Sequence, residues 1–236
     1  MNTQAIILAG GKGTRISALY PDRPKALVPV AGRPFIEHLI EFLFREGITD
    51  VHIAAGHLAG SIKAWADGYA RKPGKLTLTV EPQPLGTAGG LKFIEKHLRT
   101  DPFFALNGDS LVPNLRFADM EKQHRESGAQ ATLAVTRIEE AGRYGTVEFD
   151  ENNAITTFLE KADRKGGWVN GGVYLMSRAT LSAIAPGRNL SIETDIFPAL
   201  AQLGRLRAFR AEPPLLDMGT PEGLLAMESF LGRPET

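Results

Sequence analysis

The sequence predicts a three-layer α/β/α fold, in which a mixed and mostly parallel central sheet lies between two layers of helices. The chain opens with a short apolar run, Ala5–Leu8, bounded by glycines, as is typical of a buried parallel strand. Strand patterns then alternate with helical patterns up to about residue 130. From residue 131 strand follows strand with few helices, which favours a small antiparallel lid over the sheet edge.

The elements of the first half follow from local patterns. Apolar pairs recur at helical spacing between Pro34 and Gly47, which start and stop a helix. Residues 75–80 alternate between apolar and polar types, as a strand does. The other expected strands are 50–55 and 102–106, and the other expected helices are one containing Ile62 and Trp65, then 91–98 and 115–126.

In the second half, a helix is expected over 191–203, and Thr220 and Pro221 are typical of the first residues of a last helix. Of the histidines, His38 is expected to pack between apolar residues, and His57 and His124 to lie at the surface. The strands expected here are 131–137, 146–149, 155–159 and 168–176.

Composition limits the classes of function. The 236 residues, 43% of them hydrophobic, are enough for one large core, so we expect a single domain over 1–236. Basic and acidic residues number 27 each, which gives no electrostatic reason to bind nucleic acid or a membrane surface. The absence of cysteine excludes disulfides, thiolate metal sites and cysteine nucleophiles. Without a signal-like N-terminus or a long apolar run, the chain is expected to be cytoplasmic.

The loop after the first strand predicts a polyphosphate site. Its glycines let backbone N–H groups approach a ligand, and Lys12, Arg15 and Lys25 surround the turn with positive charge. Two other glycine motifs are excluded. A dinucleotide fingerprint counted from Gly11 would need glycine where Ile16 stands, and a P-loop needs Ser or Thr after its Gly-Lys pair.

The strings LAGG, GTR and PK resemble the signature of the sugar-1-phosphate nucleotidyltransferases. This resemblance implies a Rossmann-like fold of the nucleotidyltransferase A type, with about 1–130 binding the nucleotide and about 131–236 binding the sugar phosphate. In that family the loop wraps the nucleoside triphosphate, and the arginine and lysine, here Arg15 and Lys25, neutralise phosphate charge. The loop residues to which the resemblance assigns nucleotide binding are Leu8, Ala9, Gly10, Gly11, Lys12, Gly13, Thr14 and Arg15.

The segment 81–90 resembles the family's PLGTAG segment, which receives the nucleobase. Leu85 and Gly86 suit a flat apolar slot, and Glu81, Gln83 and Thr87 are candidates for its polar groups. Asn107 and Gly108, which follow the strand at 102–106, are further nucleotide-binding candidates. Read alone, however, Asn-Gly is equally a hairpin-turn signal.

Two aspartates are the best candidates for a Mg²⁺ site. Asp109 and Asp217 each end an apolar run beside a glycine, and each matches a metal-binding aspartate of the family. Mg²⁺ takes one or two carboxylates together with phosphate oxygens. The alternative for Asp217 is an ordinary turn aspartate.

The residues expected to bind the sugar 1-phosphate, which is the acceptor in the family's reaction, are assigned from the resemblance. Glu160 and Lys161 resemble its EK pair, with the lysine on the sugar 1-phosphate and the glutamate on sugar hydroxyls; taken alone, they would be an exposed charge pair. The other sugar-binding candidates are Tyr144, Gly145, Asn170 and Gly171. Together with the metal pair, the residues expected to carry catalysis are Arg15, Lys25, Asp109, Lys161 and Asp217.

Several strings, among them 143–145, 170–172 and 191–195, look most like D-glycero-α-D-manno-heptose 1-phosphate guanylyltransferases. These enzymes use GTP and make GDP-heptose for bacterial surface polysaccharide. The expected reaction is Mg²⁺-assisted, in-line attack of the sugar phosphate on the α-phosphorus of GTP. The alternatives are mannose-1-phosphate guanylyl transfer, uridylyl or thymidylyl transfer, and a catalytically silent nucleotide-sensing homologue. The sequence leaves the oligomeric state open, with a homodimer as one candidate.

Overall fold

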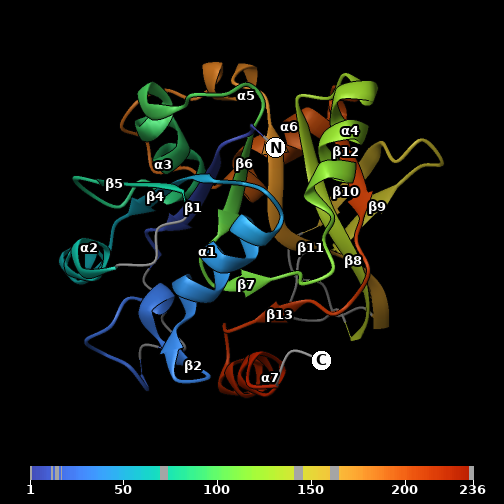
Figure 1. Ribbon diagram of the computed structural model, residues 1–236. Coiled ribbons are helices and arrows are strands. Elements are labelled where there is room, and N and C mark those ends of the chain that lie inside the picture. Colours follow the sequence, from blue (N-terminus) through green and yellow to red (C-terminus); the bar gives the residue numbers. More distant parts are fainter. Residues whose placement is uncertain are drawn as a thin grey trace.

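The computed structural model describes residues 2–11, 13, 16, 18–69, 74–140, 146–159 and 165–233 (Figure 1). Over these residues the main sheet has nine strands in the order β10-β9-β11-β6-β1-β4-β5, with β8 beside β11 and β12 beside β8. Its strands are β1 (Ala5–Ala9), β4 (Asp50–Ala55), β5 (Lys75–Val80), β6 (Phe103–Asn107), β8 (Ala131–Glu140), β9 (Thr146–Phe149), β10 (Ile155–Leu159), β11 (Lys165–Met176) and β12 (Leu206–Arg210). Two small ribbons pair β2 (Pro29–Val30) with β3 (Arg33–Pro34), and β7 (Ser110–Leu111) with β13 (Leu216–Asp217).

Helices cover both faces of the sheet, because successive side chains of each strand point to opposite sides. On β1, Ile7 belongs to one core, with residues of α1 (Phe35–Arg45), α2 (Ala59–Gly68), α4 (Phe117–Ser127) and α7 (Pro221–Leu231). Its neighbour Ile6 belongs to the other core, with residues of α3 (Gly86–Ile94), α5 (Ala179–Ser182) and α6 (Phe197–Gln202). Shorter helical turns are η1 (Lys25–Leu27), η2 (Glu95–His97) and η3 (Ile192–Ile196). The predicted three-layer α/β/α class with a mixed sheet is confirmed.

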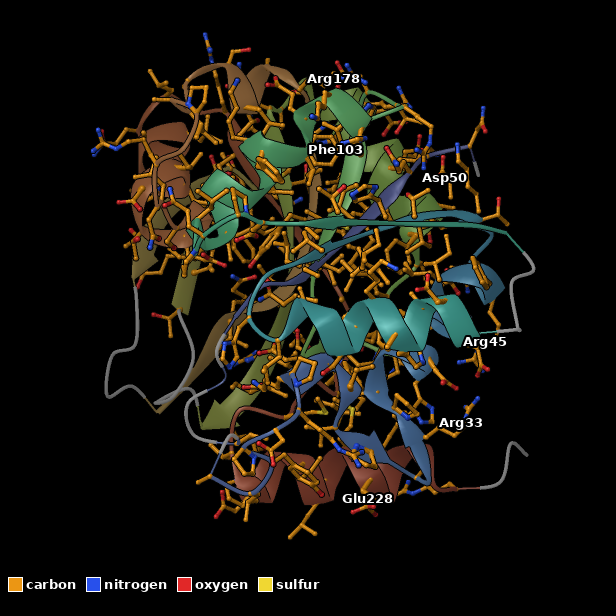
Figure 2. The ribbon with its side chains drawn as sticks, turned by 90° about the vertical axis from the view of Figure 1, so that its left-hand side faces the viewer. Arg33, Arg45, Asp50, Phe103, Arg178 and Glu228 are labelled. Carbon is orange, nitrogen blue, oxygen red and sulfur yellow. The ribbon has the colours of Figure 1, made fainter. Side chains whose placement is uncertain are left out.

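The centre of the sheet is parallel. β1 pairs in parallel with β4 on one side and with β6 on the other, and β4 pairs in parallel with β5. The carboxyl ends of these strands therefore meet at one edge, which is where open α/β sheets place ligand chemistry. Phe103, at the start of β6, is fully buried, whereas Arg45 and Glu228 lie at the periphery (Figure 2).

The antiparallel part that the sequence predicts is joined to the central sheet through β11. β11 pairs antiparallel with β6 over Val173–Met176 and with β8 over most of its length. The side chains of these four residues are all at most 3% exposed, so both faces of this stretch are covered. The earlier part of β11, residues 165–170, pairs with β8 and β9 and not with β6 (Figure 1).

The last helix begins as its sequence predicts. The Thr220 hydroxyl accepts a hydrogen bond from the Gly223 N–H at 3.1 Å, and Pro221 is the first helical residue. α7 packs against β13 and β2 (Figure 1). The helix expected over 191–203 is instead a π-helical turn, η3, followed by α6. Among the residues described here, no helix is long and apolar enough to cross a membrane.

The expectation that His124 is solvated is wrong. His124 is 4% exposed, and its Nδ1 lies 2.8 Å from the Thr132 hydroxyl on β8. A second histidine, His52 on β4, is 2% exposed, with its Nδ1 2.9 Å from the Thr77 hydroxyl. Burial is the main reason that each pKa falls to about 4, aided at His52 by the nearby His97 ring and at His124 by Arg125.

These two histidines predict that the fold loses stability in mild acid. Between the unfolded pKa of about 6.5 and the folded pKa of about 4, the unfolded chain binds more protons, so acidification favours unfolding. Each histidine contributes a slope of up to about 1.4 kcal/mol per pH unit in this window. Urea unfolding at pH 7, 6 and 5 measures it. His124→Gln should flatten the slope and the control His57→Gln, at an exposed position, should not; a constant free energy of unfolding from pH 7 to 5 would refute the assignment.

Candidate active site

A cavity of about 620 Å³ opens at the carboxyl ends of β1 and β6. Most of its lining comes from residues that the sequence assigned to the site, although they lie far apart along the chain. Those residues are Leu8, Ala9, Gly10, Gly11, Gly13, Lys25, Glu81, Leu85, Gly86, Thr87, Asn107, Gly108 and Asp109. Lys12, Thr14 and Arg15 of the first loop lie outside the described residues.

Glu81 lies in the wall of the cavity, just after β5. Its Oε2 accepts a hydrogen bond from the Leu85 N–H at 3.2 Å. Gly10 and Gly90 lie beside its other oxygen, and a Cβ at residue 10 or 90 would lie 3.0 or 2.7 Å from Oε1, so the carboxylate would have to shift. Burial raises the pKa of this carboxyl, and the Leu85 N–H partly opposes that shift. Gln83, its predicted companion, is exposed and is not among the lining residues.

The segment 81–90, hereafter the base segment, is hydrogen-bonded to a stretch of the chain about 100 residues further on. The Ala88 N–H donates to the Leu190 carbonyl at 2.9 Å, and the Leu190 N–H donates to the Leu85 carbonyl at 2.9 Å. The start of α3, which follows Glu81, is thus held by backbone hydrogen bonds before any ligand binds. Asn189, from the same distant stretch, also lines the cavity.

Two carboxylates converge on one ammonium group beside the cavity. Lys25 Nζ lies 2.6 Å from Asp109 Oδ2 and 3.8 Å from Asp217 Oδ1. The small ribbon of β7 and β13 holds the two aspartates, since Met218 N–H donates to the Asp109 carbonyl at 3.0 Å. The Lys25 side chain is only 13% exposed, against 35% for Asp109 and 25% for Asp217. Partial burial strengthens the attraction within this triad relative to an exposed ion pair.

The same two carboxylates fit the requirements of Mg²⁺. Asp109 supplies hard anionic oxygens in the lining of the cavity, and Asp217 supplies them near the same Lys25 ammonium group. Mg²⁺ prefers one or two such groups plus phosphate oxygens and water. Over the described parts of the chain, no cluster of three or more histidine, aspartate or glutamate side chains is arranged to hold a metal ion. The donor set therefore suits a metal that is shared with a phosphate ligand.

The acceptor side is described in part. Tyr144, Gly145, Glu160 and Lys161 lie outside the described residues. Asn170 and Gly171 lie on β11, where the pairing with β8 shifts register between Asn170 and Tyr174. Such a bulge re-aims side chains and is common next to active sites. Gly172 has a φ of +73°, and a Cβ there would lie 2.6 Å from the Ser110 hydroxyl, so this bend requires glycine.

The sequence missed four lining residues: Ala26, Pro84, Asn189 and Glu193. Glu193 is the most consequential of them. Its Oε2 accepts hydrogen bonds from the hydroxyls of Thr87 at 3.0 Å and Ser191 at 2.8 Å, and its Oε1 accepts one from Tyr174 at 3.0 Å. The only signal in the sequence was the polar string 191–195, which does not show where the carboxylate points.

A family model described as Nucleotidyl transferase matches residues 4–233. Two curated relatives are a mannose-1-phosphate guanyltransferase from Aspergillus oryzae, 36% identical over 232 residues, and mannose-1-phosphate guanyltransferase beta-A from Xenopus laevis, 35% identical over 227 residues. Each match covers 94% of this chain but 62% of the relative, so the chain spans about three fifths of their length. The crystal structure of HddC from Yersinia pseudotuberculosis is 26% identical with a TM-score of 0.87, over 97% of this chain and 99% of that chain.

Proposed function

Because the chain belongs to the nucleotidyl transferase family, we propose that it transfers a guanylyl group from GTP to a sugar 1-phosphate, with release of pyrophosphate. One observation carries the proposal: a single cavity brings together the glycine loop, the Glu81 carboxylate and the Lys25–Asp109 ion pair. These groups can meet a triphosphate, a base and a metal ion, respectively. The matched mannose-1-phosphate guanyltransferases support guanine as the base and a sugar phosphate as the acceptor.

The reaction is an in-line displacement at the α-phosphorus. An oxygen of the sugar phosphate forms the new bond, while the bond to the bridging oxygen breaks and pyrophosphate leaves with the electron pair. The acceptor phosphate is already an anion, so no side chain has to act as a nucleophile. Catalysis then consists of positioning and charge neutralisation, which we assign to Arg15 and Lys25 on the triphosphate and to Lys161 on the acceptor.

Asp109 and Asp217 are the proposed ligands of Mg²⁺, which when bound offsets the charge of the phosphate oxygens. Lys25 stands between the two carboxylates and limits their mutual repulsion. In this proposal the nucleotide occupies the half of the chain up to about residue 130, and the acceptor occupies the half from 131 to 236. Glu160 would contact sugar hydroxyls, and Tyr144, Gly145, Asn170 and Gly171 would surround the ring.

Mannose 1-phosphate is the acceptor that the comparisons favour, because both curated relatives carry it in their names. A second candidate is D-glycero-α-D-manno-heptose 1-phosphate, which the motif resemblance favours. Its support is the resemblance of the strings 143–145, 170–172 and 191–195. Gly171 and Gly172 do not themselves provide room for the additional exocyclic carbon, because a Cβ at these positions would lie 2.9 Å from Val112 and 2.6 Å from the Ser110 hydroxyl, respectively. Both acceptors share the manno configuration, so either one is consistent with the proposed chemistry.

The test is pyrophosphate release from a matrix of GTP, ATP, UTP and dTTP against mannose 1-phosphate, the heptose 1-phosphate and glucose 1-phosphate, each with Mg²⁺. We expect kcat/KM for GTP to exceed that for the other triphosphates tenfold or more, the scale of a buried polar group left unpaired, about 1–3 kcal/mol. The kcat/KM for each of the two manno-configured acceptors should exceed that for glucose 1-phosphate. Preference for UTP or dTTP would overturn the guanylyl assignment, and no turnover with any pair would favour a catalytically silent nucleotide-binding homologue.

A further inference from the structure

A chain of hydrogen bonds links the base segment to the acceptor strand through Glu193. On one side, the Thr87 hydroxyl at the start of α3 donates to Glu193 Oε2 at 3.0 Å and accepts the Ile192 N–H at 2.8 Å. On the other side, the buried Tyr174 hydroxyl of β11 donates to Glu193 Oε1 at 3.0 Å. The network therefore spans both proposed substrate sites.

The acceptor end of the network reaches the bulge of β11. Asn170 Nδ2 donates to the Tyr174 hydroxyl at 2.9 Å, and Asn170 Oδ1 accepts the Gly172 N–H at 2.9 Å. Tyr174 is fully buried, and burial raises the pKa of its hydroxyl, which keeps it protonated as a donor. Each hydrogen bond between the bulge and Glu193 has its donor on the side of the bulge and its acceptor on the side of Glu193. Hydrogen bonds aligned in this way strengthen one another.

We propose that Glu193 is a positioning residue that makes the two substrates bind cooperatively. The two oxygens of a carboxylate are rigidly joined, so a ligand that orders Thr87 and thereby fixes Oε2 also fixes Oε1. Oε1 in turn orients Tyr174 and, through it, Asn170 at the bulge. Occupation of the nucleotide site thus lowers the ordering cost of the acceptor site, and the reverse holds by linkage. This inference rests on the proposed function, because it assigns the two ends of the network to nucleotide and acceptor.

The network also predicts how each variant should behave. Glu193→Gln keeps the shape of the side chain but replaces one acceptor oxygen by a donor that faces hydroxyls. Those hydroxyls already accept hydrogen bonds from backbone N–H groups. Thr87 accepts from Ile192, and Ser191 accepts from Glu193 and Thr194, so the new donor lacks a good acceptor. Tyr174→Phe removes only the hydroxyl between Glu193 and Asn170 and leaves the buried ring in place.

The experiment measures the affinity for α,β-methylene-GTP, which cannot release pyrophosphate, with and without saturating mannose 1-phosphate. In the unaltered chain we expect the sugar phosphate to tighten nucleotide binding at least fivefold, within the usual range of coupling between sites. In Glu193→Gln and in Tyr174→Phe this factor should fall below twofold. The affinity of Tyr174→Phe for the nucleotide alone is measured in the same experiment, because the Tyr174 hydroxyl also interacts with the side chain of Asn107, which lines the cavity. The coupling factor is a ratio of two affinities of the same variant, so a change in the affinity for the nucleotide alone does not by itself alter it.

Glu126→Gln, at an exposed position on α4, serves as the matched carboxylate control and should keep the full coupling factor. The proposal is overturned if both network variants retain the coupling, or if the unaltered chain shows none. If Glu193 had a purely structural role, Glu193→Gln would have a lower melting temperature and would bind both substrates more weakly to the same extent, while the coupling factor persisted. Failure of the proposed function reads differently: the unaltered enzyme would release no pyrophosphate with GTP in the substrate matrix, whatever the variants do.

Discussion

Asp217→Asn should lower kcat by about 10² or more at saturating Mg²⁺, the scale of one lost electrostatic contact in a transition state. The same loss is expected for Asp109→Asn, since both carboxylates converge on Lys25 and both are proposed metal ligands. The amide keeps an acceptor oxygen for the Gly219 N–H, which Asp217 holds at 2.7 Å, so the fold should survive. The measurement is the initial rate of pyrophosphate release across a Mg²⁺ series, with thermal unfolding to verify the fold.

The control for these variants is Asp119→Asn, at an exposed position on α4. It removes the same charge from the molecule without altering the triad, so kcat should stay within a factor of two. Near-normal turnover of Asp109→Asn or Asp217→Asn would remove that residue from the metal site. An equal loss in all three variants would point to net charge as the cause instead of metal binding.

Glu81→Gln should lower kcat/KM for GTP by tenfold or more. Guanine presents donors at N1 and N2, and a carboxylate in the cavity wall can accept from both, whereas an amide offers one acceptor and one mismatched donor. A buried group left unpaired costs about 1–3 kcal/mol. The rate with ATP, which lacks these two donors, should be nearly unchanged. Competition between GTP and ATP at fixed acceptor concentration measures the change in selectivity directly.

The pH dependence of this selectivity is a second readout of the same substitution. Because burial raises the pKa of Glu81, acidification protonates the carboxyl earlier than for an exposed glutamate, and GTP affinity should fall as the pH is lowered. Glu81→Gln should abolish that dependence. Gln83→Ala, at the exposed neighbouring position, should leave selectivity within twofold. If Gln83→Ala lost the preference for GTP and Glu81→Gln kept it, the assignments of the two residues would be reversed.

The fold class and the first loop could be predicted because their signals are local. An apolar run followed by glycines describes β1 and its loop within a dozen residues, and the apolar pairs of α1 repeat at helical spacing. The convergence of Asp109 and Asp217 was expected from the family resemblance. Its physical cause, the pairing of β7 with β13, involves strands of two residues each, too short to recognise from sequence.

What the sequence did not predict depends on long-range contacts. The Glu193 carboxylate is held by hydrogen bonds from Thr87 and Tyr174, and no pattern within 191–195 predicts these contacts. His124 lies on a helix with a polar composition, so its burial follows only from the packing of Thr132 against it. The way in which the antiparallel part joins the central sheet was not predicted either, since it depends on β11 being long enough to pair with β8 and with β6.

The double pairing of β11 has a consequence for engineering. Val173–Met176 supply the hydrogen-bonding partner of β6, whose Phe104 and Leu106 are almost fully buried. A fragment ending near residue 130 would leave β6 as an open, apolar sheet edge, which is a template for aggregation. The part of the chain before residue 130 and the part after it are thus joined by a backbone ladder between β6 and β11. Fragment complementation, or a chimaera that borrows the second half of a relative, has to transfer β6 and β11 together.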